Sequence, residues 1–419
     1  MKFYFPDSQD MISPAYDFIN DEYPAWRVRQ RDDRYAHEVV PVPYDGILVS
    51  KAIVDGSLKG AGKYSTPQRE RLYRLGLRQF FRIPENVMTL GDCGAFNYIN
   101  EKEPPYSVEE VLDFYEGCGF DAGISIDHVI FGYVPDPEDA DAPTATDVEK
   151  DANPEWVERR RISLDRAEKF IAAAGVRSVK FEPVGAAQGW GPASYADSVR
   201  RLQEMGYRRI ALGGMVPLKT HEILACLRKI DEVRAESTEL HLLGITRVDS
   251  MAQFAGHGVT SFDSTSAFRQ SFMDDRDNYH TREGTYTALR VPQVDGNPTL
   301  KRQILAGAIA QRDAVAAERA CLAALRGYDS GIVPLDETLA ALGHYEALVN
   351  SGDPKKAKKS YLPAYERALR DMPWKRCPCP LCVEHGIEIA IFRGTERNKR
   401  RGFHNLTVLA AKMHALPTA

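Results

Sequence analysis

Residues Glu239 to Arg269 read ELHLLGITRVDSMAQFAGHGVTSFDSTSAFR, and this stretch decides the fold. The apolar run Leu240–Ile245 suits a buried strand, and the residues after it have helical spacing that ends at a glycine turn. A second apolar run, Val259–Phe262, suits another buried strand, and Asp263 stands at its end. The stretch therefore predicts a strand, a helix and a second strand, with a carboxylate where the second strand leaves the core.

The same pattern recurs upstream, where glycine turns precede short apolar runs that alternate with helical segments. This alternation favours βα units with parallel strands. Eight runs are expected as strands: Lys2–Phe5, Gly46–Ser50, Val87–Gly91, Ala122–Ile126, Val179–Val184, Arg209–Leu212, Leu240–Ile245 and Val259–Phe262. Eight units predict an α/β fold of the closed (β/α)8 TIM barrel type. A doubly wound open sheet is the competing fold, but no G-x-G-x-x-G follows the first strand.

Polar residues and glycines stand at the predicted strand ends, where a barrel of this type carries its chemistry. They are Asp92, Asp127, Gln188 just beyond its strand, Gly213, Gly214 and Asp263. An aspartate at a strand end often does no more than cap the next helix, so each aspartate taken alone also has a structural explanation.

Composition sets the class of protein. Of 419 residues, 43% are hydrophobic and 27% are charged, as in ordinary soluble globular proteins. No apolar run approaches the length of a membrane span, and the N-terminus lacks a signal-peptide pattern, so we expect a cytoplasmic protein. A formal charge of −5 is not typical of a nucleic-acid binder, although Arg393 to Arg401 form a local basic run.

Three of the seven cysteines lie within six residues, as Cys377, Cys379 and Cys382. An odd count crowded in this way does not suit a disulfide framework, and metal binding explains it better. With His404 the pattern is C-x-C-x2-C-x21-H, which predicts a closed tetrahedral zinc site with a structural role. His385 is the other candidate ligand, but it lies so near Cys382 that closing the tetrahedron would be strained.

Together these pieces resemble the tRNA-guanine transglycosylase family over nearly the whole chain. The matching motifs are Asp92-Cys93-Gly94-Ala95-Phe96, Ser125-Ile126-Asp127, Gln188-Gly189, Gly213-Gly214-Met215, Asp263 with Arg269 six residues on, and the zinc motif that ends in His404-Asn405-Leu406. The resemblance implies a barrel over residues 1–299, a helical and zinc-binding insertion after the last strand over 300–403, and a C-terminal helix over 404–419 that packs back on the barrel.

The resemblance also implies residue roles. Asp263 is expected to be the nucleophile, and Asp92 the general acid and base. The guanine-type base is expected to contact Asp127, Gln188, Gly213, Gly214, Met215 and Phe96. Apart from the resemblance, positive charge makes five residues candidates for phosphate contacts: Arg269, Arg393, Arg397, Lys399 and Arg400. Cys93 could serve as a nucleophile, but a buried cysteine is more often a small hydrophobe.

The chain departs from the queuosine-pathway enzymes in ways that bear on its substrate. Val216-Pro217-Leu218-Lys219 stands where those enzymes carry a Gly-Glu that helps to read the entering base. The opening residues Met1 to Asp10 and the segment Tyr44–Ser50 look like the DpdA branch, whose members exchange guanine for a 7-deazaguanine, such as preQ0, in DNA.

Three functions follow as alternatives. The first is a transglycosylase acting on DNA, the second is one acting on tRNA, and the third is a non-catalytic, zinc-bearing partner subunit that binds nucleic acid. Asp92 and Asp263 are both present, which argues against the third. The sequence leaves open whether a partner protein or a second copy of the chain takes part.

Overall fold

The computed structural model describes residues 1–7, 9–57, 60–135, 149, 152–351 and 360–416. The chain divides into two compact units. Unit 1 comprises Met1–Ser8, Tyr44–Thr265 and Ala410–Ala419, and unit 2 comprises Gln9–Pro43 and Ser266–Leu409. These bounds differ from the ranges expected from the sequence, because residues 9–43 and 266–299 group with the cysteine cluster and not with the barrel.

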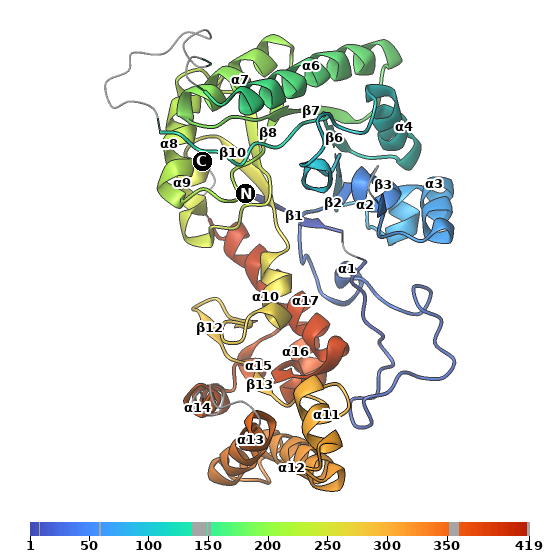
Figure 1. Cartoon of the computed structure of the whole chain (residues 1–419), viewed down its shortest axis with the longest axis vertical. Coiled ribbons are helices and arrows are strands. Elements are labelled where there is room, and N and C mark those ends of the chain that lie inside the picture. Colours follow the sequence, from blue (N-terminus) through green and yellow to red (C-terminus); the bar gives the residue numbers. More distant parts are fainter. Residues whose placement is uncertain (8, 58–59, 136–148, 150–151, 352–359, 417–419) are drawn as a thin grey trace. The chain divides into compact units, whose positions relative to one another are not determined.

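Unit 1 is built on a closed barrel of parallel strands in the order β1-β10-β9-β8-β7-β6-β5-β2 (Figure 1). The bounds are β1 Lys2–Pro6, β2 Gly46–Ser50, β5 Met88–Asp92, β6 Ala122–Ile124, β7 Glu182–Ala187, β8 Arg209–Leu212, β9 Glu239–Leu242 and β10 Val259–Asp263. The predicted barrel is confirmed. The register brings Tyr4 opposite Asp263, and Ser50 opposite Asp92, so these strands end at one mouth.

The largest shift from the expected strands is at β7, which begins at Glu182 and not at Val179. The preceding helix continues to Arg177, and Ser178 then takes a left-handed conformation, so the chain reaches the sheet later than the apolar run suggests. The barrel interior is filled by side chains from several strands, including Tyr4, Leu48, Leu90, Ile124 and Val184. Their packing buries apolar surface, which is the main favourable contribution to folding.

Helices and short strands surround the barrel in unit 1, with α6 and α7 lying along its outer face in Figure 1. They are α2 Lys51–Asp55, β3 Gly56–Ser57, β4 Gly60–Ala61, α3 Thr66–Phe81, η1 Ala95–Tyr98, α4 Val108–Cys118, α6 Pro154–Arg177, α7 Pro192–Glu204, α8 Thr220–Asp231, η2 Val248–Ser250 and α9 Met251–Ala255. In the described part of the chain, no helix is long and apolar enough to cross a membrane.

Unit 2 is mainly helical. Its elements are α1 Ala36–Val39, α10 Ser266–Met273, β11 Tyr279–His280, β12 Thr285–Tyr286, β13 Leu289–Arg290, α11 Pro298–Leu305, α12 Gln311–Asp329, α13 Leu335–Asn350, α14 Leu362–Asp371, α15 Pro373–Arg376, α16 Pro380–His385, η3 Gly386–Ile389, β14 Ile391–Phe392 and α17 Gly394–His414. The last helix begins at Gly394, so His404 lies within it and does not start it. Its last turn, from Ala410, groups with unit 1, where His414 Nε2 lies 2.9 Å from Asp45 Oδ1.

The ring of Tyr115 fixes how α4 packs on the barrel. The helix begins with a capping box in which Ser107 accepts a hydrogen bond from the Glu110 N–H. At its other end the Tyr115 hydroxyl donates to the Ile124 carbonyl at 2.9 Å. Gly91 on β5 and Gly123 on β6 leave room for the ring, because a Cβ on either glycine would lie 2.3–2.4 Å from a ring carbon.

We therefore predict that Gly123→Ala destabilises the protein by about 1–3 kcal/mol, because the added methyl group forces the buried ring of Tyr115 to move. Gly117→Ala, in the helix α4 that carries Tyr115, is the matched control. A Cβ at Gly117 meets nothing within 4 Å. That variant should be neutral or more stable by up to about 1 kcal/mol, because alanine favours helix. Denaturant unfolding measures both, and equal effects would contradict this account of the packing.

Candidate active site and metal centre

The residues expected at the strand ends do gather at the carboxyl end of the barrel. Asp92 is the last residue of β5, and Asp263 is the last residue of β10. Gln188 and Gly213 directly follow β7 and β8. Asp127 lies three residues beyond β6. Parallel strands of a closed barrel end on the same face, so these side chains share one mouth.

Asp263 is held through one of its two carboxylate oxygens. The Gly244 N–H donates to Oδ1 at 2.9 Å, and His241 Nε2 lies 3.3 Å from the same oxygen. The residue is buried, with 7% of its surface exposed. Among the described residues, none forms a hydrogen bond to Oδ2. The carboxylate is therefore fixed in orientation while one oxygen stays available for a ligand in the mouth.

Asp127 is paired with Gln188. The Gln188 amide Nε2 donates to Asp127 Oδ2 at 2.5 Å, and the Gln188 Oε1 accepts from the Ile130 N–H at 3.1 Å. Burial raises the pKa of Asp127 to about 6, and the hydrogen bond from Gln188 opposes this rise. The amide is thus oriented by the backbone and presents its donor to the carboxylate.

The two glycines beyond β8 make this pairing sterically feasible. A Cβ on Gly213 would lie 2.1 Å from Gln188 Nε2, and a Cβ on Gly214 would lie 2.3 Å from the Ile130 carbonyl oxygen. Gly214 also has a φ of +75°, which side chains rarely adopt. Tyr195 donates to the Gly213 carbonyl at 2.7 Å and holds the loop in place. Met215, the next residue, is fully buried.

Asp92 differs from the other two carboxylates. It keeps part of its surface open to the mouth, but burial raises its pKa to about 7, and the nearby charges of Asp127 and Asp263 raise it further. Backbone N–H groups of Gly94 and Cys93 oppose the rise. A carboxyl group with a pKa near neutrality can both donate and accept a proton at physiological pH.

The neighbouring Cys93 is a buried thiol whose Sγ lies 3.6 Å from the Tyr115 hydroxyl. Burial raises the pKa of this thiol well above its usual value. A thiol that does not ionise is a poor nucleophile, so the structure favours the reading of Cys93 as a small buried side chain.

Two aromatic rings lie on the surface of unit 1 near these residues. Phe96, in η1 after Asp92, is 54% exposed, and its ring centroid lies 5.2 Å from that of Phe131, which is 38% exposed. Contiguous exposed apolar surface can mark a binding site, and this pair lies close in sequence to the strand-end residues. Phe131, Gly244 and His241 were not predicted from the sequence. His241 had a signal that could have revealed it, because it is a polar residue inside the apolar run Leu240–Ile245.

The predicted metal ligands converge in unit 2. Ligand atoms of Cys377, Cys379, Cys382 and His404 all lie within 4.8 Å of one another. His404 Nδ1 lies 3.5, 3.4 and 3.5 Å from the three sulfur atoms in that order. A tetrahedral zinc with ordinary Zn–S and Zn–N bonds requires an S···N edge of about 3.6 Å. The four residues therefore fit a closed zinc site.

The surroundings orient the histidine for this role. His404 Nε2 lies 2.8 Å from the His280 carbonyl oxygen, so it carries the proton and leaves Nδ1 as a lone pair that faces the thiols. Asn405 accepts from the His280 N–H at 2.9 Å and fixes the same loop. His385, the alternative ligand, instead accepts from Arg400 Nε at 3.2 Å and is not one of the clustered residues.

Most of the predicted phosphate-binding residues have a different role. Arg393, Arg397 and Arg400 are 6%, 1% and 0% exposed. Their carboxylate partners, all in unit 2, are Asp21 and Glu318 for Arg393, Asp21 and Glu388 for Arg397, and Glu396 for Arg400. Lys399 Nζ lies 3.2 Å from Asp10 Oδ1. The prediction of phosphate contacts is corrected for the three arginines, because buried ion pairs already satisfy them. Arg269, exposed on α10, stays a prediction.

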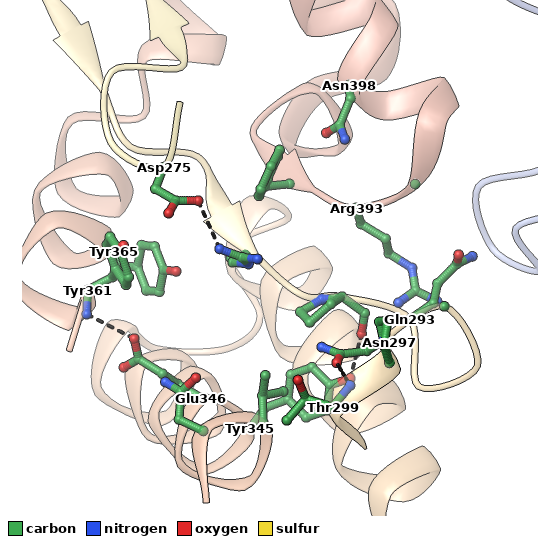
Figure 2. A pocket seen from close by; sticks show the side chains of 18 residues that line it. Asp275, Gln293, Asn297, Thr299, Tyr345, Glu346, Tyr361, Tyr365, Arg393 and Asn398 are labelled. Atoms are coloured by element: carbon green, nitrogen blue, oxygen red, sulfur yellow. Dashed lines mark hydrogen bonds and ion pairs between the residues drawn. The ribbon is translucent and has the colours of Figure 1, made fainter. Parts of the chain in front are cut away.

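A pocket of about 560 Å³ lies in unit 2, and charged residues with hydrogen-bond or ion-pair partners line it (Figure 2). Arg290 on its wall donates to Asp275 at 2.9 Å, and Glu346 accepts from the Tyr361 N–H at 2.9 Å. Arg393 also lines the pocket, but its charge is already balanced by Asp21 and Glu318. Arg290 and Asp275 thus pair within the pocket, Arg393 pairs with carboxylates outside its lining, and none of the predicted catalytic residues lines it.

Comparison with known proteins gives one strong similarity. The chain is 48% identical over 412 residues to a DNA-guanine transglycosylase of Salmonella montevideo, and the match covers 98% of this chain and 95% of the relative. No family model matches the chain.

The geometry of the cysteine cluster predicts that Cys379→Ser loses the bound metal and lowers the melting temperature, since removal of one ligand opens the closed site. Metal analysis of the purified protein, with thermal unfolding, measures both effects. Cys321→Ser, a buried thiol in α12 outside the cluster, is the control and should keep its metal. Full metal content in the Cys379→Ser protein would rule out this site.

The raised pKa of Asp92 predicts how stability changes with pH. The folded value of about 7 exceeds the ordinary value near 3.8, so the folded protein binds the extra proton between these values. The contribution of this bound proton to the stability of the folded protein is fully present below about pH 4 and is lost as the pH rises through 7. Asp92→Asn removes the cost of ionisation. The stability of the variant relative to the wild type should rise by about 2–3 kcal/mol from pH 5 to pH 8, since one pKa unit corresponds to about 1.4 kcal/mol.

Denaturant unfolding at several pH values measures this difference. Asp113→Asn is the control, because Asp113 is an exposed residue of α4 that pairs with Arg177 at the surface. A difference between wild type and Asp92→Asn that does not change with pH would contradict the raised pKa.

Proposed function

The chain belongs to the guanine transglycosylase family, whose members are pentosyltransferases. From this premise we propose that it replaces guanine in DNA with a 7-deazaguanine. The proposed reaction passes through a covalent bond between Asp263 and C1′ of the target nucleotide. One observation carries the proposal. Three carboxylates share the barrel mouth, and each has a different environment: Asp263 is held by one oxygen, Asp127 is paired with an amide, and Asp92 has a pKa near 7.

In the first half of the reaction, Asp263 attacks C1′ through its unengaged oxygen, and the bond between C1′ and the guanine ring nitrogen breaks. Asp92 gives its proton to the leaving guanine. This leaves an ester between Asp263 and the sugar, as in retaining glycosidases. The contacts of Asp263 support this step, because the Gly244 N–H and His241 hold Oδ1, while Oδ2 has no hydrogen bond among the described residues.

In the second half, the entering base loses a proton from its ring nitrogen to the Asp92 carboxylate, and that nitrogen attacks C1′. The ester bond to Asp263 breaks, and its carboxylate is restored. Asp92 therefore acts first as an acid and then as a base, which suits a group whose pKa lies near the working pH.

The base is proposed to be read by the paired side chains at the mouth. The Asp127 carboxylate accepts from the N–H edge of the base, and Gln188 with the Gly214 backbone contacts the carbonyl edge. Gly213 and Gly214 support this role, because a side chain at either position would occupy the space around Gln188. Phe96 is proposed to stack on the flat face of the base, in line with its exposure beside Phe131.

DNA is proposed as the substrate because the relative is named a DNA-guanine transglycosylase. A target base in a duplex must be flipped out or presented in a single strand before C1′ can reach Asp263. Arg269, six residues beyond the nucleophile and exposed on α10, is the proposed phosphate contact. tRNA remains the alternative substrate, and the adduct experiment below compares the two.

Zinc is proposed as the metal of unit 2, held by Cys377, Cys379, Cys382 and His404. Four protein ligands leave no position for water or substrate, so the ion would have a structural role and take no part in base exchange. Asn405 and the His280 carbonyl would hold the histidine ligand from outside the site.

The proposal predicts that the protein forms an adduct with a guanine-containing DNA oligonucleotide that survives denaturation. Asp263→Asn should abolish the adduct, because an amide is a poor nucleophile. Asp92→Asn should slow its formation by about a hundred-fold or more, because the leaving guanine then lacks its acid. Gel mobility of the denatured protein, followed over time with DNA and with tRNA, measures this.

Asp249→Asn is the control, since Asp249 is exposed in η2 on the same β9–β10 connection. It should form the adduct at the wild-type rate. Adduct formation with tRNA alone would favour the second function. No adduct or base exchange with either nucleic acid would favour the third, a non-catalytic partner subunit.

A further inference from the structure

A chain of buried polar groups crosses the barrel interior and ends at Asp263. The Arg209 guanidinium on β8 donates to the Ser261 hydroxyl on β10 at 3.0 Å. The Ser261 Oγ lies 2.9 Å from His241 Nδ1 on β9, and His241 Nε2 lies 3.3 Å from Asp263 Oδ1. All four are buried, with exposed fractions of 6% for Arg209, 1% for Ser261, 0% for His241 and 7% for Asp263.

We propose that His241 is a positioning residue for the nucleophile, locked by Arg209 and Ser261 in the tautomer that donates from Nε2 to Asp263. The proposal deepens the function above and rests on Asp263 being the nucleophile. It assigns a role to a buried histidine that the proposed base exchange does not itself require.

The direction of each hydrogen bond follows from the donors available. Arginine has only donors, so the Ser261 oxygen accepts from Arg209. The hydroxyl hydrogen of Ser261 is then free to point at His241 Nδ1. A neutral imidazole that accepts at Nδ1 carries its proton on Nε2, which faces the Asp263 carboxylate. The opposite tautomer would place a lone pair against a carboxylate oxygen, which is repulsive.

The imidazole is also kept neutral. Burial lowers the pKa of His241, the hydrogen bond that it donates to Asp263 acts in the opposite direction, and the charge of Arg209 lowers the pKa further. The groups that face it are Asp263 on β10, Arg209 on β8 and the ring of Tyr4 on β1, which lies edge-on at 5.7 Å. A neutral donor orients the carboxylate without forming an ion pair that would make Asp263 less nucleophilic.

The geometry gives the two carboxylate oxygens separate tasks. Oδ1 receives the Gly244 N–H and His241 Nε2, so rotation of the carboxylate would break both contacts. Oδ2 is then the oxygen aimed at C1′. At 3.3 Å the His241 contact is long, as catalytic hydrogen bonds often are before substrate binds.

Three variants test the proposal by exchange of labelled guanine into DNA and into tRNA. His241→Phe keeps a flat ring but removes both hydrogen bonds. It should lower the exchange rate at saturating substrate by about ten-fold to a hundred-fold, as expected for a lost bond to a charged group.

His241→Gln should restore most of the rate, because its amide nitrogen can donate from near the position of Nε2. Ser261→Ala keeps the histidine but removes the partner of Nδ1, and should give a smaller loss in the same direction. In the wild-type protein with nitrogen-15 labelled histidine, NMR should show His241 protonated at Nε2 only. This measurement does not depend on activity or on whether any variant folds.

His257→Gln is the control, since His257 pairs with Asp231 just before β10, at the other end of that strand. It should exchange guanine at the wild-type rate. The inference is overturned if His241→Phe folds and keeps the wild-type rate, or if NMR shows the proton on Nδ1. Exchange by Asp263→Asn at the wild-type rate would instead overturn the proposed nucleophile, so the two failures are distinguishable.

Discussion

Mutual repulsion among three carboxylates at one barrel mouth is the constraint on which the site depends. Charges that share a poorly solvated space raise the free energy of the folded protein unless each one is paired or protonated. The chain handles each aspartate differently: Asp263 accepts from a backbone N–H and a histidine, Asp127 accepts from Gln188, and Asp92 has a pKa of about 7. The same arrangement that lowers the repulsion in the folded protein gives the carboxylates different chemical properties, as the proposed acid and the proposed nucleophile require.

Unit 2 is mainly helical, and contacts between residues distant in sequence hold its segments together. Four ligand residues from two segments meet in a cluster, and Asn405 ties the adjacent loop to the helix that carries His404. Arg393, directly before α17, and Arg397 within it both pair with Asp21. Arg400 and Arg397 donate to the backbone carbonyls of Ser13 and Phe18, so the segment 9–43 is anchored here. Burying an arginine without a partner would cost too much solvation free energy. The acidic partners are therefore needed for these arginines to be buried in the folded protein.

The basic run shows how a one-dimensional charge pattern can mislead. Arg393, Arg397 and Arg400 look like a solvent-facing patch when read along the chain. Arg397 and Arg400 are three residues apart in α17, Arg393 directly precedes that helix, and all three side chains are buried. Arg400 pairs with Glu396 four residues away, but the compensating charges for Arg393 are Asp21 and Glu318, which lie more than seventy positions away. Such pairing has no signal in the local sequence.

By itself the sequence determined the barrel, the convergence of the strand-end residues and the four metal-ligand residues. Alternating apolar runs and glycine turns are local consequences of backbone geometry, and parallel strands of a closed barrel must end on one face. The spacing of Cys377, Cys379, Cys382 and His404 likewise follows from what a tetrahedral site needs. Only the tertiary structure decided the pKa of Asp92, the burial of the arginines and the line from Arg209 to His241. Burial, charge and hydrogen bonding at these residues come from strands and segments distant in the chain, and their effects depend on separations of a few ångströms that no local pattern specifies.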